Sequence, residues 1–225
     1  MTTVRNICKV VGIYLVLNLG VFLMLRNILE YTALNDHVGF LQAKQDYVHN
    51  QLWKAAFYTH VFSSIFTLLA GLTQFSGDLL KNHRRVHRIV GRIYAWDIIF
   101  VNFPSGLIMA IYANGHLPSK IAFLILDCLW LWFTVKAVVE IKRGNIDGHR
   151  DYMTRSYALT FSAITLRTWR LFLSAAFNLD PQLLYMLDAW LGFVPNLLCA
   201  EWLIATRKKA AQRPKNMLTA KNTAI

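Results

Sequence analysis

The chain alternates between long apolar runs and short polar connections, and six of the runs have about the length of a membrane span. A helix needs about 20 mainly apolar residues to cross the hydrocarbon of a bilayer. The runs are Ile7–Leu29, Ala55–Ser76, Ile89–Ala113, Ile121–Ile141, Ser156–Phe177 and Leu184–Thr206. Within lipid, only a helix satisfies all of its backbone hydrogen-bonding groups inside one segment. The pattern therefore predicts an all-α integral membrane bundle of about six transmembrane helices.

Lysine and arginine gather in alternate connections, and this bias predicts how the bundle is oriented. The connections on one side carry Lys81, Arg84, Arg85 and Arg88, then Lys142, Arg143 and Arg150, and finally the basic end of the chain. The opposite side carries Lys44, Lys54 and Lys120. Because basic connections stay in the cytoplasm, we expect a cytoplasmic (inner) membrane protein with both termini inside.

The organisation along the chain is simple. Residues 1–206 form one predicted transmembrane domain, and residues 207–225 form a basic cytoplasmic tail that we expect to be disordered. Such a tail is attracted to anionic lipid headgroups. The lipid bilayer and these headgroups are therefore the first predicted partners.

Composition narrows the class of function. Of the 225 residues, 56% are hydrophobic and 16% are charged, whereas about 25% of a soluble domain is charged. The net charge of +12 is spread between apolar runs rather than placed on one polar module, which argues against nucleic acid as a partner. The chain contains neither a phosphate-binding glycine loop nor a nucleophile elbow. Whether the protein is an enzyme stays open, and no catalytic residue is assigned.

Three ionisable residues inside the apolar runs form a candidate ligand site. Asp127 and Arg167 fall at comparable depth near the middle of the bilayer, at 1.5 Å of rise per residue. Arg170 lies about one turn further outward, closer to Asp188. Ionisable groups inside a span are costly and mark functional candidates. They either form buried ion pairs that fix the helix register, or the arginines hold an anionic group such as a carboxylate, a phosphate or a haem propionate.

Histidines form a second candidate site in the stretches "HRRVHRIVGRIYAW" (83–96) and "GHRDYMTRSYALT" (148–160). His87 and His149 lie at similar depth on the third and fifth predicted helices, so they could approach one haem iron from two sides. Near the opposite face, His60 and His116 form the comparable second pair. Two such pairs on opposite sides of a membrane are what a transmembrane electron carrier needs.

The arginines beside these histidines have two interpretations. Arg88, Arg92 and Arg155 could bind the propionates of a haem. Positive residues at cytoplasmic helix ends also serve simply to fix topology and to meet headgroups. Histidine is not required for headgroup anchoring, so the histidines carry more information than the arginines.

Three longer stretches carry a resemblance to a known family. They are "YTHVFSSIFTLLAGLTQF", "HRRVHRIVGRIY" and "GHRDYMTRSYALTFSAITLR". Together they resemble the bacterial multi-pass membrane family catalogued as domain of unknown function 2306, over about residues 55–175. The matching positions are His60, His87, Arg88, Gly91, Arg92, Tyr94, His149, Arg155, Tyr157 and Arg167. The resemblance implies a small helical membrane protein and assigns no activity.

Three functional hypotheses follow from the residues. The first is a haem-b-binding redox or electron-transfer protein, with His87 and His149 as iron ligands and His60 serving an outer haem or a quinone. The second is a carrier or binding protein for an anionic or lipidic ligand held by Asp127, Arg167 and Arg170. The third is a non-catalytic membrane assembly factor, in which the polar residues only hold the helices together.

Overall fold

The structure is a computed structural model that describes residues 18–74 and 77–223, and within them every regular element is a helix. The first described residues, 18–29, are helical. Two short 3₁₀-helices follow, η1 (Glu30–Ala33) and η2 (Gly39–Lys44). The remaining elements are α2 (Gln51–Gln74), α3 (Gly77–Asn82), α4 (Arg84–Asp97), η3 (Ile98–Asn102), α5 (Phe103–Ile111), α6 (His116–Lys142), α7 (Ile146–Thr160), α8 (Ser162–Ala176), α9 (Pro181–Leu191) and α10 (Val194–Thr223).

Within the described residues each predicted apolar run corresponds to helical structure, while the start of the first run and the last two residues of the second, 75 and 76, lie outside them. The third run is the continuous segment α4–η3–α5, the fifth is α7 with α8, and the sixth is α9 with α10. Three helical segments of the described chain, Arg84–Ile111, His116–Lys142 and Pro181–Gln212, are long and apolar enough to cross a membrane. The predicted fold class, an all-α membrane bundle, is confirmed.

Large apolar side chains cover the outside of the bundle. Phe100, Trp132 and Trp202 keep 57%, 54% and 65% of their surface exposed. Many other large apolar side chains of the described helices are exposed as well, among them Phe22, Phe66 and Trp96. The surface is suited to contact with the hydrocarbon of a lipid bilayer.

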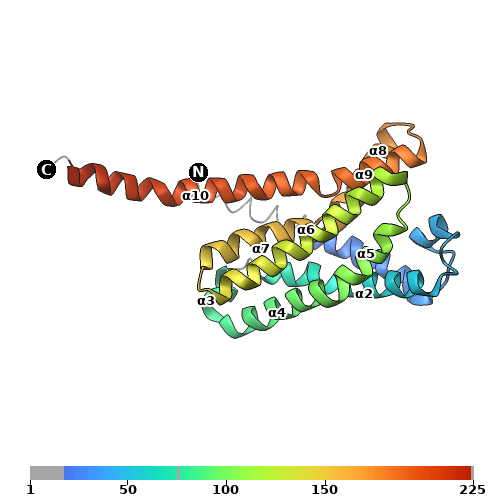
Figure 1. The fold of residues 1–225 in the computed structure, drawn as a ribbon, viewed down its shortest axis with the longest axis horizontal. Helices are drawn as coiled ribbons and strands as arrows, with labels where there is room; N and C mark the ends of the chain where they lie inside the picture. The colour runs from blue at the N-terminus through green and yellow to red at the C-terminus, as the bar shows by residue number, and fades with distance from the viewer. Residues whose placement is uncertain (1–17, 75–76, 224–225) are drawn as a thin grey trace.

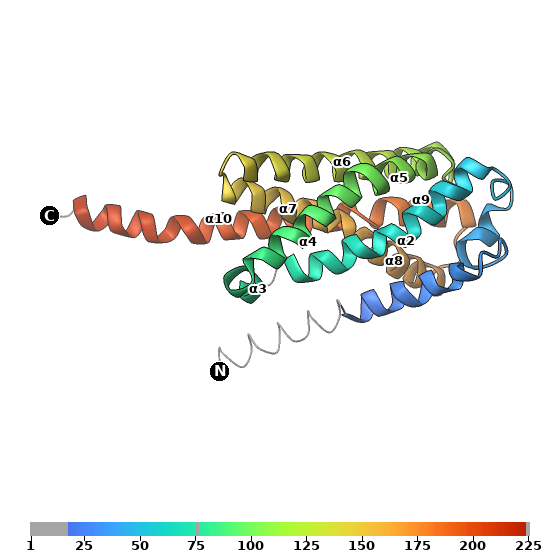
Figure 2. The same ribbon diagram turned by 90° about the horizontal axis from the view of Figure 1, so that it is seen from below.

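The bundle has two different ends, which we name by their residues. The capped end carries η1 and η2, and also the turns from α5 to α6 and from α8 to α9 (Figure 1). The basic end carries α3, the start of α4 and the turn from α6 to α7 (Figure 2). Here α10 runs on past the bundle and is helical to Thr223.

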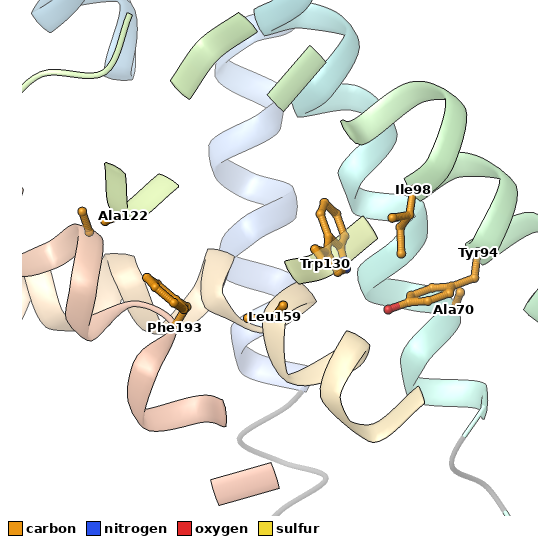
Figure 3. Close-up of a cluster of buried hydrophobic side chains, with 8 residues drawn as sticks. Ala70, Tyr94, Ile98, Ala122, Trp130, Leu159 and Phe193 are labelled. Carbon is orange, nitrogen blue, oxygen red and sulfur yellow. The ribbon is translucent and has the colours of Figure 1, made fainter. Parts of the chain in front are cut away.

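The main core lies where the third segment (α4–η3–α5) meets α6 and α7. Tyr94 and Ile98 from the third segment pack with Trp130 of α6 and Leu159 of α7 (Figure 3). Tyr94 is 1% exposed, and its hydroxyl contacts those of Ser156 and Thr160 at 2.8 Å each. Because buried hydroxyls need partners, this network lets polar residues occupy the core.

Candidate functional site

A cavity of about 630 Å³ runs from the capped end into the middle of the bundle. We call it the central cavity. It is lined by the helix of residues 18–29 and by η1, η2, α2, α5, α6, α7, α8 and α9, and most of its lining is apolar. Five of the ionisable residues that line it are His60, Asp127, Arg167, Arg170 and Asp188. The structure thus brings the predicted ligand residues and His60 to one cavity.

Asp127 presents a free carboxylate oxygen to this space. The residue is 3% exposed, and its Oδ2 has no hydrogen-bond partner among the residues that the structure describes. Gly106 of α5 faces it so closely that a β-carbon there would lie 2.9 Å from Oδ1. A buried oxygen without a partner costs free energy in the absence of a ligand, so Asp127 is available to a hydrogen-bond donor.

Arg167 lies on α8 at the same cavity. Its Nη1 donates a 2.7 Å hydrogen bond to the carbonyl oxygen of Ala163, one turn earlier on the helix. In the described chain no carboxylate lies within ion-pair distance of this guanidinium. Asp127 and Arg167 line one space but form no ion pair with each other, so the first of the two interpretations does not describe Arg167.

Arg170 does form an ion pair, and its partner is Asp188. Its Nε donates to Oδ2 of Asp188 over 2.7 Å, and Asp188 is 1% exposed. The guanidinium also lies over the ring of Tyr185, 5.2 Å from the ring centre. The register-fixing interpretation thus applies to Arg170, whereas Arg167 is left with an uncompensated charge.

His60 is held by an irregular turn in the third segment. Pro104 lacks the backbone N–H that would bond to the carbonyl of Phe100, and residues Ile98–Asn102 form a π-helix. The carbonyl oxygen of Asn102 lies 3.3 Å from Nδ1 of His60. Since Nδ1 is occupied in this way, Nε2 is the ring nitrogen left for a ligand.

Lys44 lines the capped end of the cavity and is a residue that the sequence did not single out. It is 2% exposed. Its ammonium donates to the carbonyl oxygen of Tyr112 and, over 2.7 Å, to Oδ1 of Asn114. Burial, and then the positive charge of Lys120, lower the pKa of Lys44 to about 8. A lysine in an outer connection looks like a surface residue, so only its tertiary contacts identify it.

The second candidate site lies elsewhere. His87 and His149 are at the basic end, and neither lines the central cavity. They are near enough to interact electrostatically. Nδ1 of His149 is 2.8 Å from the carbonyl oxygen of Ala137, while Nδ1 of His87 has no partner among the described residues. His116 is exposed at the start of α6, so it does not join His60 in the cavity.

The three arginines that the sequence offers as partners for haem propionates differ in their surroundings. Arg88 and Arg92 are exposed on α4. Arg155 is bound to Glu201 of α10 through bonds of 2.5 Å from Nε and 2.8 Å from Nη2. Within residues 18–74 and 77–223, no group of three or more His, Cys, Asp or Glu residues could hold a metal ion.

The chain matches one protein family over a segment that includes most of the residues lining the central cavity. The sequence profile of a protein family described as Predicted membrane protein (DUF2306) matches residues 57–204. No curated protein and no solved structure matches the chain. The matched segment includes His60, Asp127, Arg167 and Arg170, whereas Lys44 precedes it.

Proposed function

The chain belongs to this family of predicted membrane proteins, and we propose that it binds an amphipathic anion in the central cavity. The ligand would have an apolar chain and a carboxylate or phosphate group. The observation that carries the proposal is Arg167, whose guanidinium faces an apolar cavity of about 630 Å³ without a carboxylate partner. A desolvated charge of this kind is costly unless an opposite charge is bound.

The rest of the cavity supports the same ligand class. The guanidinium is a planar donor that suits carboxylate and phosphate groups. Lys44 adds a second cation that is bonded only to neutral oxygens. Oδ2 of Asp127 can accept a hydrogen bond from a hydroxyl or amide of the ligand. The apolar lining provides the contact for a single hydrocarbon chain.

Binding can be tested with decyl phosphate as the probe. Purified protein in discs of zwitterionic lipid is titrated while tryptophan fluorescence is recorded, because Trp53 and Trp130 line the cavity. A hydrogen bond to a charged group contributes about 1.5–3 kcal/mol, so Arg167→Gln is expected to weaken binding roughly 10- to 100-fold. Arg88→Gln, which removes an exposed arginine outside the cavity, is the matched control and should bind as the wild type does.

The proposal predicts that binding requires the anionic group of the ligand as well as its hydrocarbon chain. Decanol has the same chain without the anion and is expected to bind at least about tenfold more weakly, which corresponds to 1.4 kcal/mol. Equal binding of decanol and decyl phosphate would contradict the proposal. So would a folded wild-type protein that binds neither probe.

We further propose that the basic end faces the cytoplasm of a cytoplasmic membrane, with both termini inside. Two of the three lysines on the other side are engaged, because Lys44 is buried and Lys54 pairs with Asp36 over 2.7 Å. The remaining asymmetry of positive charge favours the basic end as the inner side. In a cysteine-free background, the exposed positions His49 and Asp147 can each be changed to cysteine. An impermeant maleimide applied to intact cells should label only His49→Cys; labelling of Asp147→Cys alone would reverse the orientation.

A second candidate function is haem binding at the basic end. The bond from His149 to the carbonyl of Ala137 supports it, because ligating histidines usually donate their other ring nitrogen to such an acceptor. His87 lies on another helix within electrostatic range of His149, and the exposed Arg88 and Arg92 are available for propionates. A bound haem would supply one-electron chemistry, and a quinone would be the corresponding redox partner.

A spectrum distinguishes this candidate from the first. Protein expressed with ample haem is expected to show a reduced-minus-oxidised Soret difference, and His149→Ala is expected to lose most of it. The matched control is His116→Ala, since His116 is exposed and apart from the pair. A colourless wild-type protein would rule the haem out and leave the amphipathic anion untouched.

A further inference from the structure

A smaller cavity of about 190 Å³ lies beside the central one at the capped end. We call it the side cavity. Its lining consists of Ala43, Asn114, Arg170, Pro181, Gln182, Leu184 and Tyr185. Ala43, Arg170 and Tyr185 also line the central cavity. The two spaces therefore meet at the Arg170 side chain.

Only one of the donor groups of Arg170, its Nε, is hydrogen-bonded at this junction. Its Nε binds Oδ2 of Asp188, while Oδ1 of Asp188 has no partner among the described residues. The ion pair is thus a single bond and not a two-bond fork. Neither Nη of Arg170 donates to another described residue, and 37% of the side chain is exposed. Both Nη groups can bind an anion while Nε keeps its bond to Asp188.

The polar residues around the side cavity favour an anion there. Oε1 of Gln182 accepts from the backbone N–H of Gly115 over 2.9 Å, which leaves the amide NH₂ as a free donor. Asn114 binds the ammonium of Lys44 through Oδ1. Among the described residues, Asp188 carries the one acidic group in contact with Arg170, and it lines the central cavity only.

On the basis of the proposed function, we propose that Arg170 is the first binding position for the anionic group of the ligand. The group would reach it through the side cavity and then move on to Arg167. The two arginines are three residues apart on α8, about one turn or roughly 4.5 Å along the axis. Two successive guanidinium positions allow the charge to move inward without losing a cationic partner. The ligand is thereby a single-chain anion that enters from the capped end.

Association kinetics test this route. In stopped-flow mixing with decyl phosphate, the double variant Arg170→Gln/Asp188→Asn removes both charges of the pair. The ligand passes an intermediate binding position both on entry and on release, so its removal slows both steps. Association and release are therefore expected to slow by about tenfold each, while the affinity changes less than about twofold. Arg167→Gln should instead speed release and leave association near the wild-type rate, because Arg167 is the final position.

A second variant tests the same route without touching the buried pair. Gln182→Glu keeps the acceptor for Gly115 but adds a negative charge at the exposed rim of the side cavity. It should slow association about threefold to tenfold and make it faster at high salt, since salt screens the repulsion. Gln51→Glu is the matched control, an identical change at an exposed position outside both cavities.

The outcomes separate this inference from the proposed function. Wild-type protein that fails to bind decyl phosphate would overturn the binding proposal itself. Binding that is intact, with association rates unchanged in both Gln182→Glu and a folded Arg170→Gln/Asp188→Asn, would overturn the route alone. Thermal unfolding of each variant establishes that it is folded.

Discussion

Gly71→Ala is expected to destabilise the bundle by about 3 kcal/mol, at the upper end of the usual cost of overpacking a core. Gly71 lies on α2 where that helix meets α7. A β-carbon at this position would lie 1.6 Å from Cε2 of the Tyr157 ring, a distance that no side-chain rotation on Gly71 can relieve. The ring itself is tied down, because its hydroxyl donates to the carbonyl oxygen of Leu68 over 3.2 Å. Small residues allow helices in membranes to approach closely in this way.

The measurement is the unfolding midpoint of the detergent-solubilised protein. Gly77→Ala is the matched control, because a β-carbon at Gly77 would meet nothing within 4 Å. A shorter partner should rescue the first variant, so Gly71→Ala/Tyr157→Leu is expected to regain much of the lost stability. A midpoint for Gly71→Ala equal to that of Gly77→Ala would mean that α2 and α7 are further apart than the structure has them.

The helical bundle could be predicted from the sequence because hydropathy alone identifies membrane helices. The six apolar runs needed no knowledge of tertiary contacts, and each coincides with helical structure in the described residues. The ends of the helices could not be predicted as well as their existence. Helix α4 already begins at Arg84, five residues before the predicted span at Ile89, because a charged helix can continue beyond the hydrocarbon. The same applies to α10, which continues beyond the predicted span that ends at Thr206 and is helical to Thr223.

The candidate site was predicted in part, and depth was the useful signal. Counting residues along each span placed Asp127 and Arg167 at one level and Arg170 one turn away, near Asp188. It could not say which pairs form, since that depends on how each helix is rotated. The structure pairs Arg170 with Asp188 and leaves Arg167 without a carboxylate. Lys44 entered the prediction only as a positive charge of the opposite side, because its burial in the cavity depends on a fold of the connection that has no periodic pattern.

Lys44 gives the second large effect, which is a rise in stability between about pH 8 and pH 10.5. The ordinary pKa of a lysine is 10.5, and in the folded protein burial, helped by the charge of Lys120, lowers the pKa of Lys44 to about 8. Below pH 8 the ammonium is charged in both states, and the folded protein bears the cost of burying it. Between pH 8 and 10.5 the folded chain has lost this proton, whereas the unfolded chain still binds it.

The sign of the effect follows from proton uptake. In this interval unfolding takes up a proton at Lys44, so raising the pH makes unfolding less favourable and stability increases. One pKa unit corresponds to about 1.4 kcal/mol, and the interval therefore amounts to about 3 kcal/mol. Above pH 10.5 the lysine is neutral in both states, and its contribution is constant.

Denaturation as a function of pH in three proteins isolates this contribution. Wild-type stability is expected to rise by about 3 kcal/mol relative to Lys44→Met, which has no group to titrate at this position. Lys44→Arg also lacks the rise, because a guanidinium remains charged throughout the interval. It should therefore fall progressively below the wild type as the pH increases. Parallel curves for wild type and Lys44→Met would show that Lys44 is not buried as a charged group.

Ligand binding should shift the pH interval in which stability rises, and this shift links the pH effect to the central cavity. Lys44 lines the cavity, and an anion bound there favours the charged ammonium. Saturating decyl phosphate is therefore expected to shift the start of the stability rise above pH 8, whereas decanol, which has no charge, should leave it in place. By linkage, decyl phosphate should bind more weakly as the pH rises through this interval. That loss of affinity should disappear in Lys44→Met, because only the wild-type side chain exchanges its proton there.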